Sequence, residues 1–140
     1  MKNIVMAFGF LLVAILVAAS IASIETDSSK EQMLTENVRT ALYQTMKECS
    51  EDTTWLGVYN KYAGEEMEVR EGFTKEDEIL VLRFKENLKA LMNTTDDIKV
   101  RILAADQKDG LFSVEVEQTY SNWGVRRKTT TKETVIRNDM

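Results

Sequence analysis

The feature that most constrains this chain is an uncharged apolar run from Ile4 to Ile24, interrupted only by two serines. As an α-helix, a run of this length spans about 30 Å, which is the thickness of the hydrocarbon core of a bilayer. The remainder of the chain is polar enough to remain in water. We therefore expect residues 1–25 to form a membrane anchor or signal segment, and residues 26–140 to form a single extracytoplasmic α+β domain.

Charges on the two sides of the apolar run predict its orientation. Lys2 and the α-amino group precede the run, whereas Glu25 and Asp27 follow it. Because positive charge is retained on the inner side, we expect a single-pass protein of the cell membrane, with a cytoplasmic N-terminus and an extracytoplasmic C-terminal domain. The run is longer than the apolar core of a usual signal peptide, which favours an intact anchor.

Two cleaved forms of this segment are the alternatives. A secretory signal peptide would be cut after the Ser-Ile-Ala sequence that precedes Ser23. A prepilin-like leader would instead be cut between Gly9 and Phe10. These three fates of the segment differ in whether the mature chain stays in the membrane.

Small residues recur along one face of the apolar run. Ala14, Ala18 and Ala22 are spaced four residues apart, and small side chains at this spacing let two helix backbones approach closely. We therefore expect the N-terminal helix to contact membrane lipid and to mediate self-association or binding of protein partners.

Composition argues against several classes of function. The formal net charge is −5 and the longest basic run is Arg126-Arg127-Lys128, which disfavours nucleic-acid binding. The chain has no histidine, so Ser–His and Cys–His nucleophiles are excluded, and its single cysteine, Cys49, excludes an internal disulfide. We therefore predict a protein that is not an enzyme, with no catalytic residues, no cofactor and no metal site. A domain nearly free of cysteine suits a bacterial envelope.

The first part of the domain has the pattern of an amphipathic helix, from Ser28 to about Glu48. Its apolar positions recur every fourth residue and are expected to hold a sheet, namely Leu34, Val38, Leu42 and Met46. No glycine or proline separates this helix from the apolar run. We expect one nearly continuous helix, with a short break near Asp27 as the alternative.

Two further helical segments follow. Trp55, Tyr59 and Tyr62 fall at helical spacing within 54–63, where they form either a contact patch or a small core beneath a loop; we favour the small core. Thr74 is a good N-cap, followed by acidic residues in the first turn, and predicts a helix that ends near Asn93.

From Asp97 onward the apolar period changes to two, which predicts three strands in an antiparallel meander packed on the helices. The facing pairs predicted by the buried positions and turns are Ile102 with Phe112, Val100 with Val114, Ile98 with Val116, and Glu117 with Lys128. The last strand, from Val125 to Arg137, is rich in threonine and charge, and is expected to be an exposed edge.

This order of elements resembles that of type IV pilin-like proteins, including minor pseudopilins and small envelope proteins of tight-adherence pili. The family's processing motif is a glycine cut site, an aromatic residue and a glutamate at the fifth mature position. Gly9-Phe10 matches the cut site, and Ala14 stands at the position of the glutamate.

The resemblance implies a structural or assembly component of a surface filament or a secretion apparatus, in which the apolar helix anchors the subunit and packs in the filament core. The alternatives are a membrane-tethered accessory or binding module that does not polymerise, and a secreted soluble domain with a cleaved signal peptide. The contact surface of such a module would be the Trp55–Tyr62 cluster or the edge of the last strand.

Overall fold

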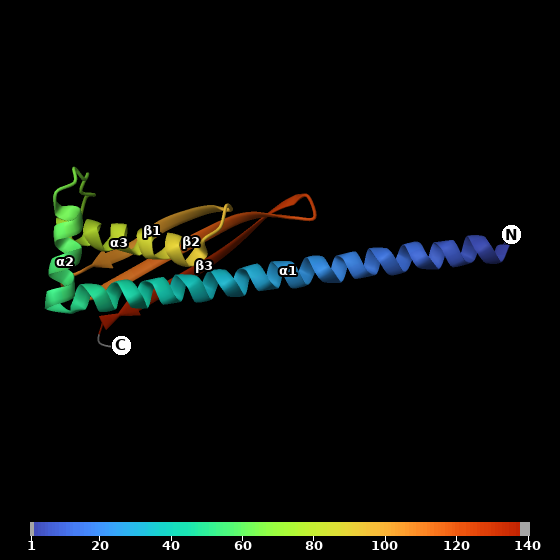
Figure 1. The fold of residues 1–140 in the computed structure, drawn as a ribbon, viewed down its shortest axis with the longest axis horizontal. Coiled ribbons are helices and arrows are strands. Elements are labelled where there is room, and N and C mark those ends of the chain that lie inside the picture. The colour runs from blue at the N-terminus through green and yellow to red at the C-terminus, as the bar shows by residue number, and fades with distance from the viewer. Residues whose placement is uncertain (1, 138–140) are drawn as a thin grey trace.

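The computed structural model describes residues 2–137, with side chains described for residue 6, residues 12–15 and residues 26–137. Its elements are α1 (Lys2–Ser50), α2 (Asp52–Ala63), α3 (Lys75–Met92), β1 (Asp97–Asp106), β2 (Leu111–Asn122) and β3 (Val125–Ile136). The fold is α+β, with helices followed by a three-stranded antiparallel sheet in the order β1-β2-β3. The sheet, α2 and α3 gather around the C-terminal half of α1 (Figure 1).

α1 is one helix from Lys2 to Ser50, without the break near Asp27 that the sequence left open. Continuity is expected on physical grounds, because neither glycine nor proline interrupts the backbone hydrogen bonds between Ile24 and Lys30. The N-terminal half of α1 projects away from the rest of the molecule (Figure 1). The large apolar side chains described in that half are 52–62% exposed, namely Met6, Leu12, Val13 and Ile15.

Within the part of the chain whose side chains are described, no helix contains an apolar stretch long enough to cross a bilayer. Most side chains of the apolar run lie outside that part, including those of Phe10, Ala18 and Ala22, as does the exposure of Gly9. The membrane segment and its cleavage sites therefore stay predictions from the sequence.

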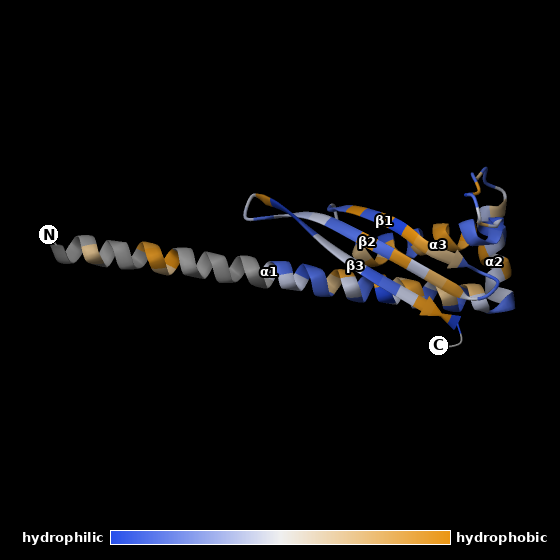
Figure 2. Ribbon diagram, turned by 180° about the vertical axis from the view of Figure 1, so that it is seen from behind, coloured by the Kyte–Doolittle hydropathy of each residue, from blue (hydrophilic) through white to orange (hydrophobic). Residues whose placement is uncertain are grey.

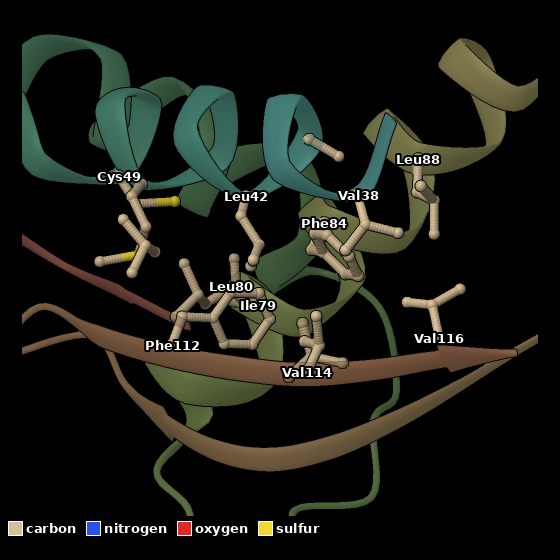
Figure 3. Packing of buried hydrophobic residues seen from close by; sticks show 14 of the residues in the cluster. Val38, Leu42, Cys49, Ile79, Leu80, Phe84, Leu88, Phe112, Val114 and Val116 are labelled. Carbon is tan, nitrogen blue, oxygen red and sulfur yellow. The ribbon is translucent and has the colours of Figure 1, made fainter. Parts of the chain in front are cut away.

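The core lies between the C-terminal half of α1, α3 and one face of the sheet (Figure 3). The four apolar residues that recur every fourth position in α1 are 0–1% exposed, namely Leu34, Val38, Leu42 and Met46. α3 contributes Phe84, whose ring meets that of Phe112 on β2 edge to face, with centroids 5.3 Å apart. This geometry brings the positive edge of one ring to the negative face of the other.

α3 begins and ends where the sequence predicts. The backbone N–H of Asp77 donates to Thr74 Oγ1 at 3.2 Å, and the backbone N–H of Thr74 donates to Asp77 Oδ2 at 2.9 Å. This capping box satisfies two backbone donors that the first helical turn leaves unpaired. Asn93 ends the helix in the left-handed conformation, with φ of 41°.

The predicted register between β1 and β2 is wrong by two residues. Ile102 faces Val114, Val100 faces Val116 and Ile98 faces Gln118. The predicted pairs require a turn centred on Gln107, whereas β1 continues to Asp106, which pairs with Leu111, so the turn is centred between Lys108 and Asp109. A β-bulge between Ile102 and Ala104 then shifts the later pairs by one residue. The turn closes at Gly110, which has φ of +75° and donates its backbone N–H to the carbonyl oxygen of Asp106 at 2.9 Å.

The pairing of Glu117 with Lys128 is also wrong in register, since Lys128 faces Thr119. The turn is a tight one at Trp123 and Gly124, both at positive φ, rather than one centred on Asn122 and Trp123. The ion pair nevertheless forms diagonally, with Lys128 Nζ 3.6 Å from Glu117 Oε1.

β3 is an edge of the sheet, as predicted, but it buries more than expected. Thr131 and Val135 are buried, and Thr35 Oγ1 of α1 donates to Thr131 Oγ1 at 3.3 Å. The reason is that α1 packs on the β3 side of the sheet. Figure 2 shows that β3 is hydrophilic over most of its length and hydrophobic toward its C-terminal end.

Candidate functional site: the junction between α1 and the β2–β3 hairpin

A polar junction joins α1 to the far end of the β2–β3 hairpin. The Asp27 carboxylate accepts two hydrogen bonds at Oδ1, from Tyr120 Oη at 2.5 Å and from Asn122 Nδ2 at 3.0 Å. Arg127 Nε lies 4.0 Å from Asp27 Oδ2. We call these four residues the Asp27 clamp, because one side chain of α1 is held by three of the hairpin.

The alternation of β2 builds this junction. Phe112, Val114 and Val116 face the core, and the same face continues as Gln118, Tyr120 and Asn122, all of them buried. The inner face of the sheet therefore changes from apolar to polar toward the hairpin tip. Buried polar groups need partners, and Asp27 supplies one for both Tyr120 and Asn122.

A second polar contact lies beside the clamp. Asp96 Oδ2 accepts from Gln118 Nε2 at 2.9 Å and from Lys30 Nζ at 3.0 Å. Lys30 is on α1, one turn after Asp27, and its amino group also lies 5.5 Å from the centre of the Tyr120 ring. The loop before β1, the hairpin and α1 are thus connected at the same end of the domain.

The clamp shifts the proton equilibria of its members. The hydrogen bond from Tyr120, and then that from Asn122, hold the pKa of Asp27 below its usual value. Burial, followed by the hydrogen bond to Asp27, raises the pKa of Tyr120 to about 12. At neutral pH the pair is therefore a neutral phenol donating to a carboxylate, which is a charge-assisted hydrogen bond.

The residues singled out from the sequence lie in three places. Ala14 is exposed on the projecting half of α1, whereas the side chains of Phe10, Ala18 and Ala22, and the exposure of Gly9, lie outside what the structure describes. Leu34, Val38, Leu42 and Met46 are in the core.

The aromatic cluster of α2 is mostly packed. Tyr62 is in the core and its hydroxyl donates to Glu86, while Trp55 and Tyr59 are half-buried and meet edge to face with centroids 6.0 Å apart. The exposed large apolar residue of α2 is Leu56.

Sequence reasoning missed two surfaces. One is the hairpin tip, where Trp123 is 69% and Val125 52% exposed. The other is a cavity of about 320 Å³ between α3 and β1, lined by Lys85, Leu88, Lys89, Met92, Thr94, Ile98 and Val100. Lys85 and Lys89, one turn apart on α3, are the charged residues of this lining.

Reactive groups are sparse in the described part of the chain. There, no three or more His, Cys, Asp or Glu side chains are arranged to hold a metal ion. The Cys49 thiol is buried, and burial raises its pKa to about 12, which suppresses the nucleophilic thiolate. The chemistry of the junction is that of a structural connection between a helix and a sheet.

No protein-family model matches the chain, and no significant match is found among curated proteins or solved structures. Function is therefore inferred from the architecture and side-chain chemistry of the chain itself.

Proposed function

We propose that this chain is a non-enzymatic, membrane-anchored extracytoplasmic protein with a pilin-like architecture. It serves as a structural or assembly component of a surface filament or secretion apparatus. Residues 4–24 form the anchor, and α2, α3 and the sheet form the domain that the anchor carries.

The observation that carries this proposal is the division of α1 into two halves. The C-terminal half is covered by α3 and the sheet, whereas the N-terminal half extends beyond the domain and exposes Leu12, Val13 and Ile15 (Figure 1). Exposure of several large apolar side chains on one segment is unfavourable in water and marks a surface that contacts lipid or protein. The uncharged sequence from Ile4 to Ile24 supports lipid as that environment.

Continuity of α1 supports a mechanical role. Because one helix runs through both halves, a subunit held by its N-terminal half positions its domain rigidly outside the membrane. The small residues Ala14, Ala18 and Ala22 supply the face on which the N-terminal halves of two copies pack closely.

The first experiment is the intact mass of the protein recovered from fractionated cells. An uncut chain in the membrane fraction supports the anchor, and a chain that begins at Phe10 supports prepilin-type processing. A chain that begins near Ser23 and is recovered in the soluble fraction would overturn the anchor.

The second experiment tests assembly through the alanine face. The double variant Ala14→Leu/Ala18→Leu is expected to lose self-association, measured by energy transfer between labelled copies in lipid vesicles. Val13→Leu/Val17→Leu is the matched control, since it adds bulk at the same spacing on another face of the helix. Unchanged association of the alanine double variant would contradict assembly and favour a monomeric, membrane-tethered accessory module.

A further inference from the structure

The tip of the β2–β3 hairpin combines features that its fold does not require. Trp123 is 69% and Val125 52% exposed, and Arg126 follows on the same strand with 77% of its side chain exposed. Trp123 has φ of 54°, a conformation in which asparagine or glycine is the usual residue. A tryptophan there contributes nothing to the core of the domain.

The clamp fixes where this tip lies. Asn122 is bonded to Asp27, and Trp123 is the next residue, so the tip begins within a few ångströms of the contact with α1. The hairpin points along α1 toward its N-terminal half (Figure 1). Trp123 and Val125 are therefore on the side of Asp27 that faces the apolar run.

The proposed anchor sets the depth of the hairpin tip relative to the bilayer. The hydrocarbon core would end near Ile24, and the headgroup layer beyond it is roughly 5–8 Å thick on each side, or about four residues of helix. Asp27 would then lie within the headgroup layer, and the hairpin tip at the boundary between headgroups and hydrocarbon.

The side chains at the tip suit that boundary. Tryptophan is enriched there because its ring is apolar while its indole N–H bonds to polar groups. Val125, the first residue of β3, adds exposed apolar area beside Trp123. Figure 2 shows a short hydrophobic segment near the tip of the hairpin. The Arg126 guanidinium forms an exposed ion pair with Asp97, and it offers hydrogen bonds to lipid phosphate.

We propose that the β2–β3 hairpin tip is a second membrane contact, in which Trp123 and Val125 insert at the headgroup boundary and Arg126 binds lipid phosphate. This inference rests on the proposed membrane anchor. It adds that the domain lies against the bilayer in one orientation, held at α1 and at the hairpin.

The test uses the full chain in phosphatidylcholine–phosphatidylglycerol vesicles that contain acyl-brominated lipid, which quenches tryptophan at the membrane. The chain has two tryptophans, so Trp55→Phe leaves Trp123 alone and Trp123→Phe leaves Trp55 alone. Flotation of the vesicles reports independently whether the chain is inserted. We expect Trp123 to be quenched with a blue-shifted emission, and Trp55, on α2 at the opposite end of the domain (Figure 1), to be unaffected.

Adding Asp27→Ala to the Trp55→Phe chain tests the role of the clamp. Removal of the carboxylate is expected to reduce the quenching of Trp123, whereas Glu31→Ala, one turn further along α1, is expected to leave it unchanged.

Three results would overturn the inference. A chain that floats with vesicles while Trp123 remains unquenched would leave the anchor standing and remove the hairpin contact. Shielding of Trp123 from aqueous iodide without quenching by brominated lipid would assign the tip to a contact with a second copy of the chain. A chain that does not float would remove both the anchor and the hairpin contact.

Discussion

Tyr120 donates a hydrogen bond to Asp27 across 93 residues of chain, with 2.5 Å between the two oxygens. This bond joins the end of the sheet to the point where α1 leaves the domain. It therefore decides how rigidly the sheet follows the projecting half of α1.

Acid is expected to weaken this junction. The pKa of Asp27 is lower in the folded chain than its usual 3.8, mainly through the bond from Tyr120. A carboxyl group with a depressed pKa stabilises the fold fully above the unfolded-state pKa, and this contribution is lost as pH falls through the folded-state pKa. The difference in urea midpoint between the wild-type chain and Asp27→Asn should shrink as pH falls from neutral to below 3.8.

The comparison with Asp27→Asn is necessary because other carboxyl groups, including Glu86 and Asp96, also have lowered pKa values. Their contributions are common to both chains and cancel in the difference. A difference in midpoint that stays constant over the same pH range would show that Asp27 is not linked to folding.

Alkali is expected to weaken the junction by ionising Tyr120, which donates the hydrogen bond to Asp27. Burial and the bond to Asp27 raise the pKa of Tyr120 from 10.0 to about 12. A group whose pKa is raised on folding stabilises the fold fully below pH 10, and this contribution is lost as pH rises through 12. Absorbance titration of phenolate in the wild-type chain should show a component near pH 12 that Tyr120→Phe lacks.

Tyr62→Phe is the control for this titration, since burial also raises the pKa of Tyr62. If Tyr120→Phe instead removed a component near pH 10, the phenol would be in contact with water and the clamp would be open in solution.

The sequence was most informative where the chemistry is local. Two local patterns predicted helices correctly. One is the apolar residue at every fourth position from Leu34 to Met46, and the other is the N-cap at Thr74; each involves neighbours within a few residues, and the structure has both helices and the cap. The register of β1 against β2 was harder to predict because it depends on the position of the turn, which is centred between Lys108 and Asp109, and on a bulge near Leu103. Adding one residue to a strand shifts every later pair.

The Asp27 clamp could not be predicted from the sequence, for a different reason. Asp27 looks like an ordinary charge after an apolar run, and Tyr120 like one more alternating strand residue. Only the packing of α1 on the β3 side of the sheet brings them together. Contacts of this sequence separation depend on the tertiary arrangement, and no local pattern encodes them.

A buried hydrogen bond between α1 and α3 is expected to matter for stability. Asn87 Nδ2 donates to Thr45 Oγ1 at 3.0 Å, and both residues are buried. Thr45→Val would leave the Asn87 amide without this acceptor, which is expected to cost roughly 1–3 kcal/mol of unfolding free energy. Urea unfolding of Thr45→Val, Asn87→Leu and the double variant should give a non-additive cycle, with the double variant less destabilised than the sum.

Thr40→Val is the matched control, because it makes the same substitution at an exposed position of the same helix. It is expected to change the free energy of unfolding by less than about 0.5 kcal/mol. Additive effects of the two core substitutions would mean that the Thr45–Asn87 bond contributes no coupling between the helices.

Cys49 decides whether copies of this chain can be linked by a disulfide. Its side chain is 2% exposed at the end of α1, and burial raises its pKa to about 12. Since the thiolate is the reactive form, both access and ionisation oppose reaction at neutral pH. We expect the native chain to react with a thiol reagent far more slowly than the chain in urea, and to form no disulfide dimer under air.

An exposed cysteine provides the reference rate. Cys49→Ala combined with Thr53→Cys moves the thiol four residues along, to an exposed position at the start of α2. This variant should react rapidly and form dimers under the same oxidising conditions. Equal reaction rates of the native chain and this variant would mean that the end of α1 opens readily, and a disulfide between subunits would then be available to the assembled protein.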